Sequence, residues 1–127
     1  EGPWVLKRGA TYYLIYSGTG ADSADYGVGY ATAASPLGPF RKNPANPIMH
    51  RSDGVYGPGH GMPVEDGAGG WWYVYHQKVR AEQGWSRFVC VDRLVFDKDG
   101  RLSGEATRGV ARLAPVPLAP VPLGARR

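Results

Sequence analysis

Short runs in which apolar and polar residues alternate, separated by turns rich in glycine and proline, follow one another along this chain. Runs of about 4–8 residues with this alternation are typical of β-strands, and long stretches of good helix formers are few. We therefore predict an all-β protein made of antiparallel strands. The strands are expected at residues 4–8, 12–17, 26–33, 40–42, 62–65, 71–78 and 87–96, with a weak edge strand after residue 100.

The predicted strands form two similar groups. Residues 12–17 align with residues 71–76 when the chain is shifted against itself by 59 positions, and the same shift places Glu1 on His60. Repeats of roughly 40–60 residues that contain several short strands are typical of β-propeller blades. Because the first strands of successive blades start close to one axis, we expect the Glu1 carboxyl and the His60 imidazole to meet there.

The repeat divides the chain into two four-stranded blades, at residues 1–47 and 54–105, and a Pro- and Arg-rich tail at residues 106–127. We expect the tail to be an extended, solvated segment. A closed propeller needs roughly four to eight blades. Either the chain is the C-terminal part of a larger propeller, or copies of it associate; we expect a homo-oligomer, since two blades leave wide apolar faces uncovered.

Composition and charge narrow the classes of partner. The chain has 127 residues, 43% of them apolar, which is enough for a packed core. Its net charge of +4 arises entirely after residue 100, because residues 1–100 carry ten basic and ten acidic side chains. We therefore expect no nucleic-acid partner. No apolar stretch is long enough to cross a bilayer, so we expect no membrane partner either.

Aromatic side chains are the remaining candidates for binding chemistry. An aromatic ring offers a flat apolar face on which a sugar ring can stack, while the sugar hydroxyls form hydrogen bonds at its edge. Alternation within a strand directs successive side chains to opposite faces, so we predict that most of these rings pack between the sheets. The rings concerned are Tyr16, Trp71, Trp72, Tyr75 and Trp85.

Several motifs, in order and at sensible spacing, resemble the C-terminal part of glycoside hydrolase family 43, whose members are five-bladed propellers acting on arabinose- and xylose-containing polysaccharides. The resemblance covers about residues 1–103. The motifs are Glu1-Gly2-Pro3 before the Tyr12-Tyr13-Leu14 strand, residues 26–31, the turn 35–40, the histidine loop 57–61, the strand 72–76, and Arg87 with residues 97–100.

The resemblance implies roles for individual residues. It makes Glu1 the general acid of an inverting glycosidase, and it places His60 beside the sugar and facing a central cation, commonly calcium. The family's general base and a second, orienting residue are aspartates that this chain does not match. No other cofactor is implied. An extracellular or periplasmic location is compatible with the family, but the sequence leaves localisation open.

Two further substrate-binding candidates come from the residues themselves. Arg87 begins a strand and can bond a sugar hydroxyl or a carboxylate, with a surface ion pair as the alternative. Tyr16 offers an aromatic face. The loop carboxylates Asp22, Asp25 and Asp53 are weak replacements for the general base, unless a second copy of the chain supplies one.

Two functions remain open from the sequence. The first is a glycosidase acting on arabinofuranosyl or xylosyl linkages of plant polysaccharides, with reduced activity while the general base is lacking. The second is a carbohydrate-binding or assembly module derived from a propeller, without catalysis.

Overall fold

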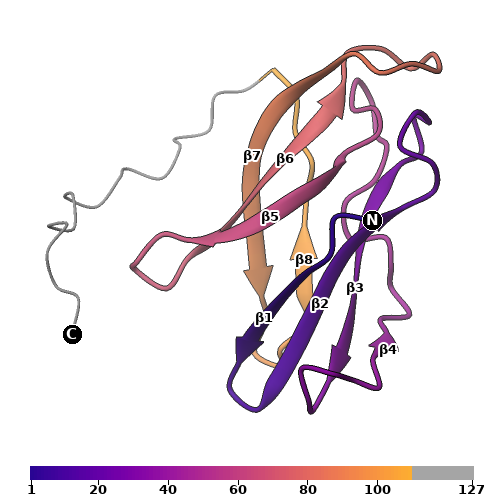
Figure 1. The fold of residues 1–127 in the computed structure, drawn as a ribbon. Helices are drawn as coiled ribbons and strands as arrows, with labels where there is room; N and C mark the ends of the chain where they lie inside the picture. Colours follow the sequence, from indigo (N-terminus) through magenta and orange to yellow (C-terminus); the bar gives the residue numbers. More distant parts are fainter. Residues whose placement is uncertain (110–127) are drawn as a thin grey trace, which may run out of the picture.

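The computed structural model describes residues 1–109, which form two four-stranded antiparallel sheets (Figure 1). In each sheet the strands lie side by side in chain order, so each pair is joined by a direct antiparallel connection. The predicted all-β fold with two four-stranded units is confirmed. The first sheet contains β1 (Trp4–Arg8), β2 (Thr11–Gly18), β3 (Gly27–Ala33) and β4 (Arg41–Lys42), and the second contains β5 (Gly59–Glu65), β6 (Trp71–Lys78), β7 (Arg87–Phe96) and β8 (Leu102–Gly104).

The core lies between the two sheets and is closed by tyrosines that bond across it. Ile15 and Val28 are fully buried in the first sheet, as is Tyr73 in the second. The Tyr13 hydroxyl donates to the carbonyl oxygen of Gly100 at 2.8 Å, and the Tyr30 hydroxyl accepts from the backbone N–H of Leu102 at 3.2 Å. These bonds satisfy buried polar groups and fix one sheet against the other.

The first strand of the first sheet is preceded by a β-bulge. Glu1 and Ser17 exchange two backbone hydrogen bonds, whereas the next recorded pair joins Trp4 to Ile15. Two residues, Gly2 and Pro3, therefore stand opposite Tyr16 alone. Gly2 takes a φ of +58°, a left-handed conformation that glycine adopts without strain.

The second sheet has the same irregularity at the corresponding place. Gly59 pairs with His76 and Met62 with Val74, so His60 and Gly61 stand opposite a single residue. His60 takes a φ of +50°. The predicted strand 62–65 therefore begins earlier, at Gly59, because the pairing continues through the bulge into the glycine-rich loop.

A constant offset of 59 residues does not describe the repeat. The buried positions Tyr13, Ile15 and Ser17 of β2 match Tyr73, Tyr75 and Gln77 of β6, an offset of 60. The buried positions Leu6 and Pro63 of the first strands differ by 57. The hairpin lengths differ between the units, so one shift cannot align both strands. Glu1 and His60 still come together, since each precedes or begins the first strand of its sheet.

The prediction that most of the aromatic rings pack between the sheets holds for Tyr75, which belongs to the core, and for Trp71, which packs against it. Trp72 is buried outside that core, against Asp66 and Arg93. By contrast, 71% of the Trp85 surface is exposed. Trp85 lies in the loop between β6 and β7, where strand alternation does not determine which way a side chain points.

The chain stays packed against the second sheet beyond β8. Ala106 is buried, and Thr107 binds the Asp92 carboxylate through its N–H at 3.0 Å and its hydroxyl at 2.6 Å. These residues belong to the segment that the sequence assigns to the tail. The Pro-rich run and the last arginines of that segment lie outside the described residues. No helix within residues 1–109 is long and apolar enough to cross a membrane.

The close packing at the β5 bulge predicts that a side chain at Gly61 destabilises the fold. A Cβ at Gly61 would lie directly against the Val74 carbonyl oxygen, so Gly61→Ala should lower the free energy of unfolding by about 1–3 kcal/mol. Gly18→Ala is the matched control, because no atom lies within 4 Å of its added Cβ. Urea unfolding of both variants measures the difference. Equal stabilities would contradict the close packing at the bulge.

Candidate active site

Glu1 is held at one end of the first sheet by its own backbone. Its nitrogen donates to the Ser17 carbonyl oxygen at 2.7 Å, and the Ser17 N–H donates to the Glu1 carbonyl oxygen at 2.8 Å. The Glu1 side chain remains half exposed. The carboxyl group is therefore fixed in position and open to solvent.

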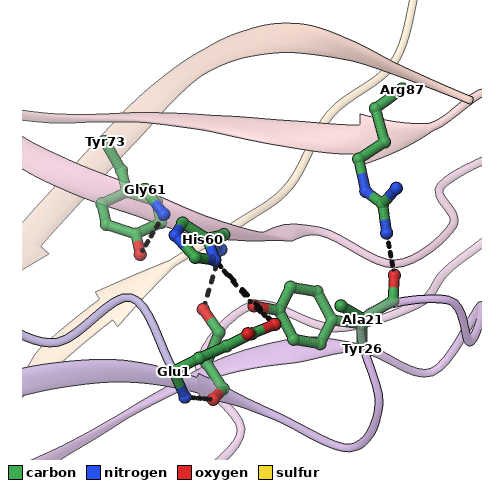
Figure 2. Close-up of polar contacts among 8 residues, drawn as sticks. Glu1, Ala21, Tyr26, His60, Gly61, Tyr73 and Arg87 are labelled. Carbon is green, nitrogen blue, oxygen red and sulfur yellow. Dashed lines mark hydrogen bonds and ion pairs between the residues drawn. The ribbon is translucent and has the colours of Figure 1, made fainter. Parts of the chain in front are cut away.

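Two side chains meet the Glu1 carboxylate, one from each unit (Figure 2). Tyr26, which is 1% exposed, donates its hydroxyl to Glu1 Oε1 at 2.8 Å. His60 Nδ1 lies 3.9 Å from the same oxygen and 3.5 Å from the Tyr26 hydroxyl. The structure thus brings Glu1 and His60 together, as the sequence predicts, and adds Tyr26 between them.

His60 is positioned through its backbone. Its N–H donates to the Ser17 hydroxyl at 2.9 Å, which ties the second sheet to the first. The following N–H, of Gly61, donates to the Tyr73 hydroxyl at 3.2 Å. A Cβ on Gly2 would lie 3.2 Å from the His60 Cα, so glycine at that position lets the two bulges approach closely.

The His76 ring packs against this cluster. Its ring stacks on Tyr26, with centroids 5.9 Å apart, and on His60, with centroids 6.1 Å apart. His76 Nδ1 is buried and has no hydrogen-bond partner among residues 1–109. Burial lowers the His76 pKa, and the positive charge of Arg87 lowers it further. Near neutral pH the His76 ring is therefore uncharged where it stacks on the Tyr26 and His60 rings.

The Glu1 carboxyl is ionised near neutral pH in this arrangement. The hydrogen bond from Tyr26 is the largest cause that lowers the pKa of Glu1, and His60 and the α-amino group lower it further. The Tyr26 pKa moves the other way, because burial and the neighbouring carboxylate both disfavour the phenolate. An acid catalyst needs a raised pKa, so the ligand-free site holds Glu1 in the conjugate-base form.

Arg87 lies at the same end of the sheets but bonds the protein backbone. Its guanidinium donates to the carbonyl oxygen of Ala21, in the loop after β2, and to that of Trp85 at 2.8 Å. Figure 2 shows Arg87 beside the cluster and directed at Ala21. Arg87 forms no ion pair among the described residues, which answers the alternative that the sequence left open.

Tyr16 is not part of the cluster. Its hydroxyl accepts a hydrogen bond from the Asn46 amide at 3.3 Å, and Asn46 in turn bonds both backbone groups of Tyr30. Tyr16 precedes Ser17 in β2, so its side chain leaves the opposite face of the strand. Its assignment to substrate binding stays a prediction.

The donors around His60 do not make up a calcium site. Calcium takes six to eight oxygen ligands in proteins. Glu1 supplies one carboxylate, and no group of three or more His, Cys, Asp or Glu side chains within residues 1–109 is arranged to hold a metal ion. The described residues therefore do not fit a bound calcium ion on their own.

Sequence reasoning missed Tyr26 and His76 as members of the site. The sequence analysis places both only within predicted strands, Tyr26 at the start of residues 26–33 and His76 within residues 71–78. The glycine-rich loop 57–61 indicates a close approach in general, because a Cβ on Gly59 would collide with the Tyr26 ring, but the sequence does not show which ring packs there.

The family model for glycosyl hydrolases family 43 matches residues 1–102. The chain belongs to this family. Its two sheets are consecutive blades of a β-propeller, the fold of the family 43 structures that it resembles. Members of the family generally need no cofactor.

The relatives include three glycosidases. The chain is 36% identical over 104 residues to beta-D-galactofuranosidase xynD from Aspergillus niger, covering 80% of this chain and 30% of the relative. A thermostable family-43 glycoside hydrolase matches with a TM-score of 0.83 and 37% identity over 91% of this chain and 38% of that chain. An endo-1,4-beta-xylanase from Bacteroides thetaiotaomicron matches with a TM-score of 0.77 and 35% identity over 84% and 38%. The chain thus spans less than two fifths of each relative.

The hydrogen bond between Tyr26 and Glu1 can be tested by titration. Tyr26→Phe removes the largest cause that lowers the Glu1 pKa, so this pKa should rise. The bond favours the ionised form, so its stabilisation of the fold is present above the ordinary glutamate pKa and is lost as the pH falls through the lowered value. NMR titration of a carbon-labelled Glu1 carboxyl measures the shift.

Tyr16→Phe is the control, because its hydroxyl bonds only Asn46. It should leave the Glu1 pKa unchanged. An equal Glu1 pKa in the parent and in Tyr26→Phe would show that the hydroxyl does not bond the carboxylate.

Proposed function

We propose that this chain is part of a glycoside hydrolase that cleaves arabinofuranosyl or xylosyl linkages of plant polysaccharides, with Glu1 as the general acid. The observation that carries the proposal is the Glu1 carboxylate held by Tyr26 and flanked by His60 at the shared end of two blades. The relatives support the class of substrate: one is named a xylanase, and another acts on a furanoside.

The geometry of the carboxylate suits an acid. Tyr26 binds Oε1, which leaves Oε2 to carry a proton and deliver it to the glycosidic oxygen of the leaving group. The side chain is half exposed at this end of the sheets, so a sugar can reach it. Tyr26 thereby orients the acid without occupying the oxygen that reacts.

Protonation of Glu1 requires a change when substrate binds. The pKa of a carboxyl group rises when it is taken out of water or placed near a second carboxylate. A bound sugar covers the exposed half of the Glu1 side chain and supplies the first of these effects. We propose that substrate binding raises the Glu1 pKa from its lowered value in the free chain.

An inverting mechanism also needs a general base, with the two carboxyl groups roughly 6.5–9.5 Å apart. Two of the three loop carboxylates already have partners: Asp22 accepts from Gln83, and Asp25 pairs with Arg51 at 3.5 Å. The third, Asp53, is exposed in the loop before β5. We infer that the base is an aspartate on another part of the propeller or on a second copy of the chain.

The other predicted residues receive roles as binding groups. His60 faces the same solvent-exposed space as Glu1 and can bond a sugar hydroxyl through its ring nitrogens. Arg87 holds the loops beside the site, and Tyr16 remains a proposed sugar contact. A calcium ion at the propeller axis would need oxygen ligands beyond those of this chain, so no step of the mechanism depends on it.

One observation favours the second candidate, a carbohydrate-binding module without catalysis. The free chain stabilises Glu1 as a carboxylate, which can accept hydrogen bonds from sugar hydroxyls but cannot donate a proton. Both functions predict sugar binding, and only the first predicts turnover that depends on Glu1.

Hydrolysis of aryl α-arabinofuranoside and aryl β-xyloside decides between them. We expect weak turnover that falls by roughly 10²-fold or more in Glu1→Gln, because a positioned general acid contributes about that much. Glu65→Gln is the control, since Glu65 is exposed at the opposite end of β5. Turnover that is unaffected by Glu1→Gln would remove Glu1 from the chemistry, and carbohydrate binding without turnover would favour the binding module.

Self-association of the chain is a separate prediction. Exposed apolar side chains on β7, including Val89 and Val95, give a surface that another sheet can cover. We expect oligomers in sedimentation experiments at micromolar concentration. If a second copy supplies the base, specific activity should also fall on dilution. A stable monomer with constant specific activity would contradict both expectations.

A further inference from the structure

The loop between β6 and β7 carries an aromatic ring that the site described above does not use. Trp85 is 71% exposed, the largest exposure of any tryptophan among residues 1–109. An exposed indole presents a broad apolar face to water, and a ligand that covers it gains the free energy of burying that face. A ring that is already held in one position loses less side-chain freedom when such a ligand binds.

Arg87 holds Trp85 in place from one side. Its guanidinium carbon lies 4.8 Å from the centre of the Trp85 ring, and its Nη1 donates to the Trp85 carbonyl oxygen at 2.8 Å. Nη2 of the same group donates to the Ala21 carbonyl oxygen, which anchors the arginine in turn. The ring is thus fixed on its arginine face, so binding a flat ligand on the opposite face costs little further ordering.

The ring belongs to the same end of the molecule as Glu1. β6 ends and β7 begins at this end, where Lys78 pairs with Arg87. Figure 1 shows the loop between β6 and β7 at the same end of the molecule as the loop between β2 and β3. The Gln83 amide donates to the Asp22 carboxylate, which joins these two loops. The Trp85 loop is therefore bonded to the loop that ends at Tyr26, whose hydroxyl binds the Glu1 carboxylate.

The loop that carries Trp85 also encloses a pocket of about 360 Å³, which the chain neighbours of Trp85 line although Trp85 itself does not. The lining residues are Lys78, Val79, Arg80, Glu82, Gln83, Gly84 and Ser86. Carbohydrates are recognised by an aromatic face for the ring carbons and by polar side chains for the hydroxyls. The loop offers both. The Lys78 ammonium already bonds the Asp22 carbonyl oxygen, and the remaining charged members, Arg80 and Glu82, have opposite charges, which suits a neutral sugar better than an ionic ligand.

We propose that Trp85 is a stacking platform for a sugar ring of the polysaccharide beyond the bond that is cleaved, with hydroxyl contacts from the polar side chains of the same loop. The ligand class is a neutral pentose-containing oligosaccharide or polysaccharide. This inference rests on the proposed function for its substrate class. A substrate with a single sugar ring would fill the position at Glu1 and leave Trp85 uncovered.

The experiment compares polysaccharide binding with turnover of a short substrate. Affinity electrophoresis of the full chain in gels that contain soluble arabinoxylan or arabinan gives the dissociation constant for each polymer. Trp85→Ala should weaken the tighter of these associations by about tenfold or more, the loss typical of removing a buried aromatic anchor, and Trp85→Phe should restore most of it. The KM for an aryl monoglycoside should change less than twofold in both variants.

Leu37→Ala is the matched control. Leu37 is 94% exposed and lies in the loop after β3, at the end of the sheets away from Glu1. It should bind both polymers as the parent does. Thermal unfolding of each variant checks that the fold is retained, which is expected because neither side chain belongs to the core.

The outcomes separate the two proposals. If Trp85→Ala binds both polymers as tightly as the parent, or if the parent binds neither polymer, the platform is wrong, whatever Glu1→Gln does to turnover. If Trp85→Ala loses binding while turnover of the aryl glycosides is absent or independent of Glu1, the platform stands and the catalytic proposal fails.

Discussion

The arrangement of the candidate site depends on one hydrogen bond, from the buried Tyr26 hydroxyl to the Glu1 carboxylate at 2.8 Å. That bond fixes the carboxylate, lowers its pKa and brings it beside His60 of the other blade. It exists only because two backbones come unusually close. A side chain on Gly59 would occupy the space of the Tyr26 ring, and one on Gly2 would press on His60. Gly2 in the first bulge and Gly59 beside the second therefore allow a carboxyl, a phenol and an imidazole to lie close together.

Two cationic side chains, one at the end of β6 and one at the start of β7, bind the loop that precedes Tyr26. The Lys78 side chain is fully buried, and its ammonium donates to the Asp22 carbonyl oxygen. The Arg87 guanidinium donates in the same way to the Ala21 carbonyl oxygen. A buried cation is costly unless it is hydrogen-bonded, so these carbonyl contacts constrain the loop conformation strongly. The second blade thus shapes the loop of the first blade, and the same arginine supports Trp85. One set of contacts therefore links the loop that positions Tyr26, and through it Glu1, to the proposed sugar platform.

Sequence reasoning reached the fold and the pairing of Glu1 with His60 but not the chemistry between them. Strand alternation and turn residues located all eight strands, because these are local signals, and the repeat placed Glu1 and His60 at equivalent ends. The contact with Tyr26 depends on a loop whose path is fixed by residues more than fifty positions away, so no local pattern reveals it. The unequal hairpins had a similar effect on register: because the β5–β6 connection is longer than the β1–β2 connection, a single shift could not show that the faces of β2 and β6 match at a different offset from β1 and β5. Alternation does not extend into a loop, so it could not show that Trp85 is the exposed exception among the aromatic rings.

The central claim, that Tyr26 and His76 connect Glu1 with His60 in one cluster, is tested most directly by proton contacts in the folded protein. A nuclear Overhauser spectrum of the full chain, with histidine and tyrosine rings selectively labelled, reports which ring protons lie within about 5 Å of each other. The stacked rings at 5.9 Å and 6.1 Å between centroids predict cross-peaks from His76 to both Tyr26 and His60, and from Tyr26 to the Glu1 side chain. The control is the core contact between the Tyr13 and Tyr30 rings, which shows that the chain is folded. If this contact is intact but the Tyr26 ring gives no cross-peak to either His76 or Glu1, the cluster does not exist as described.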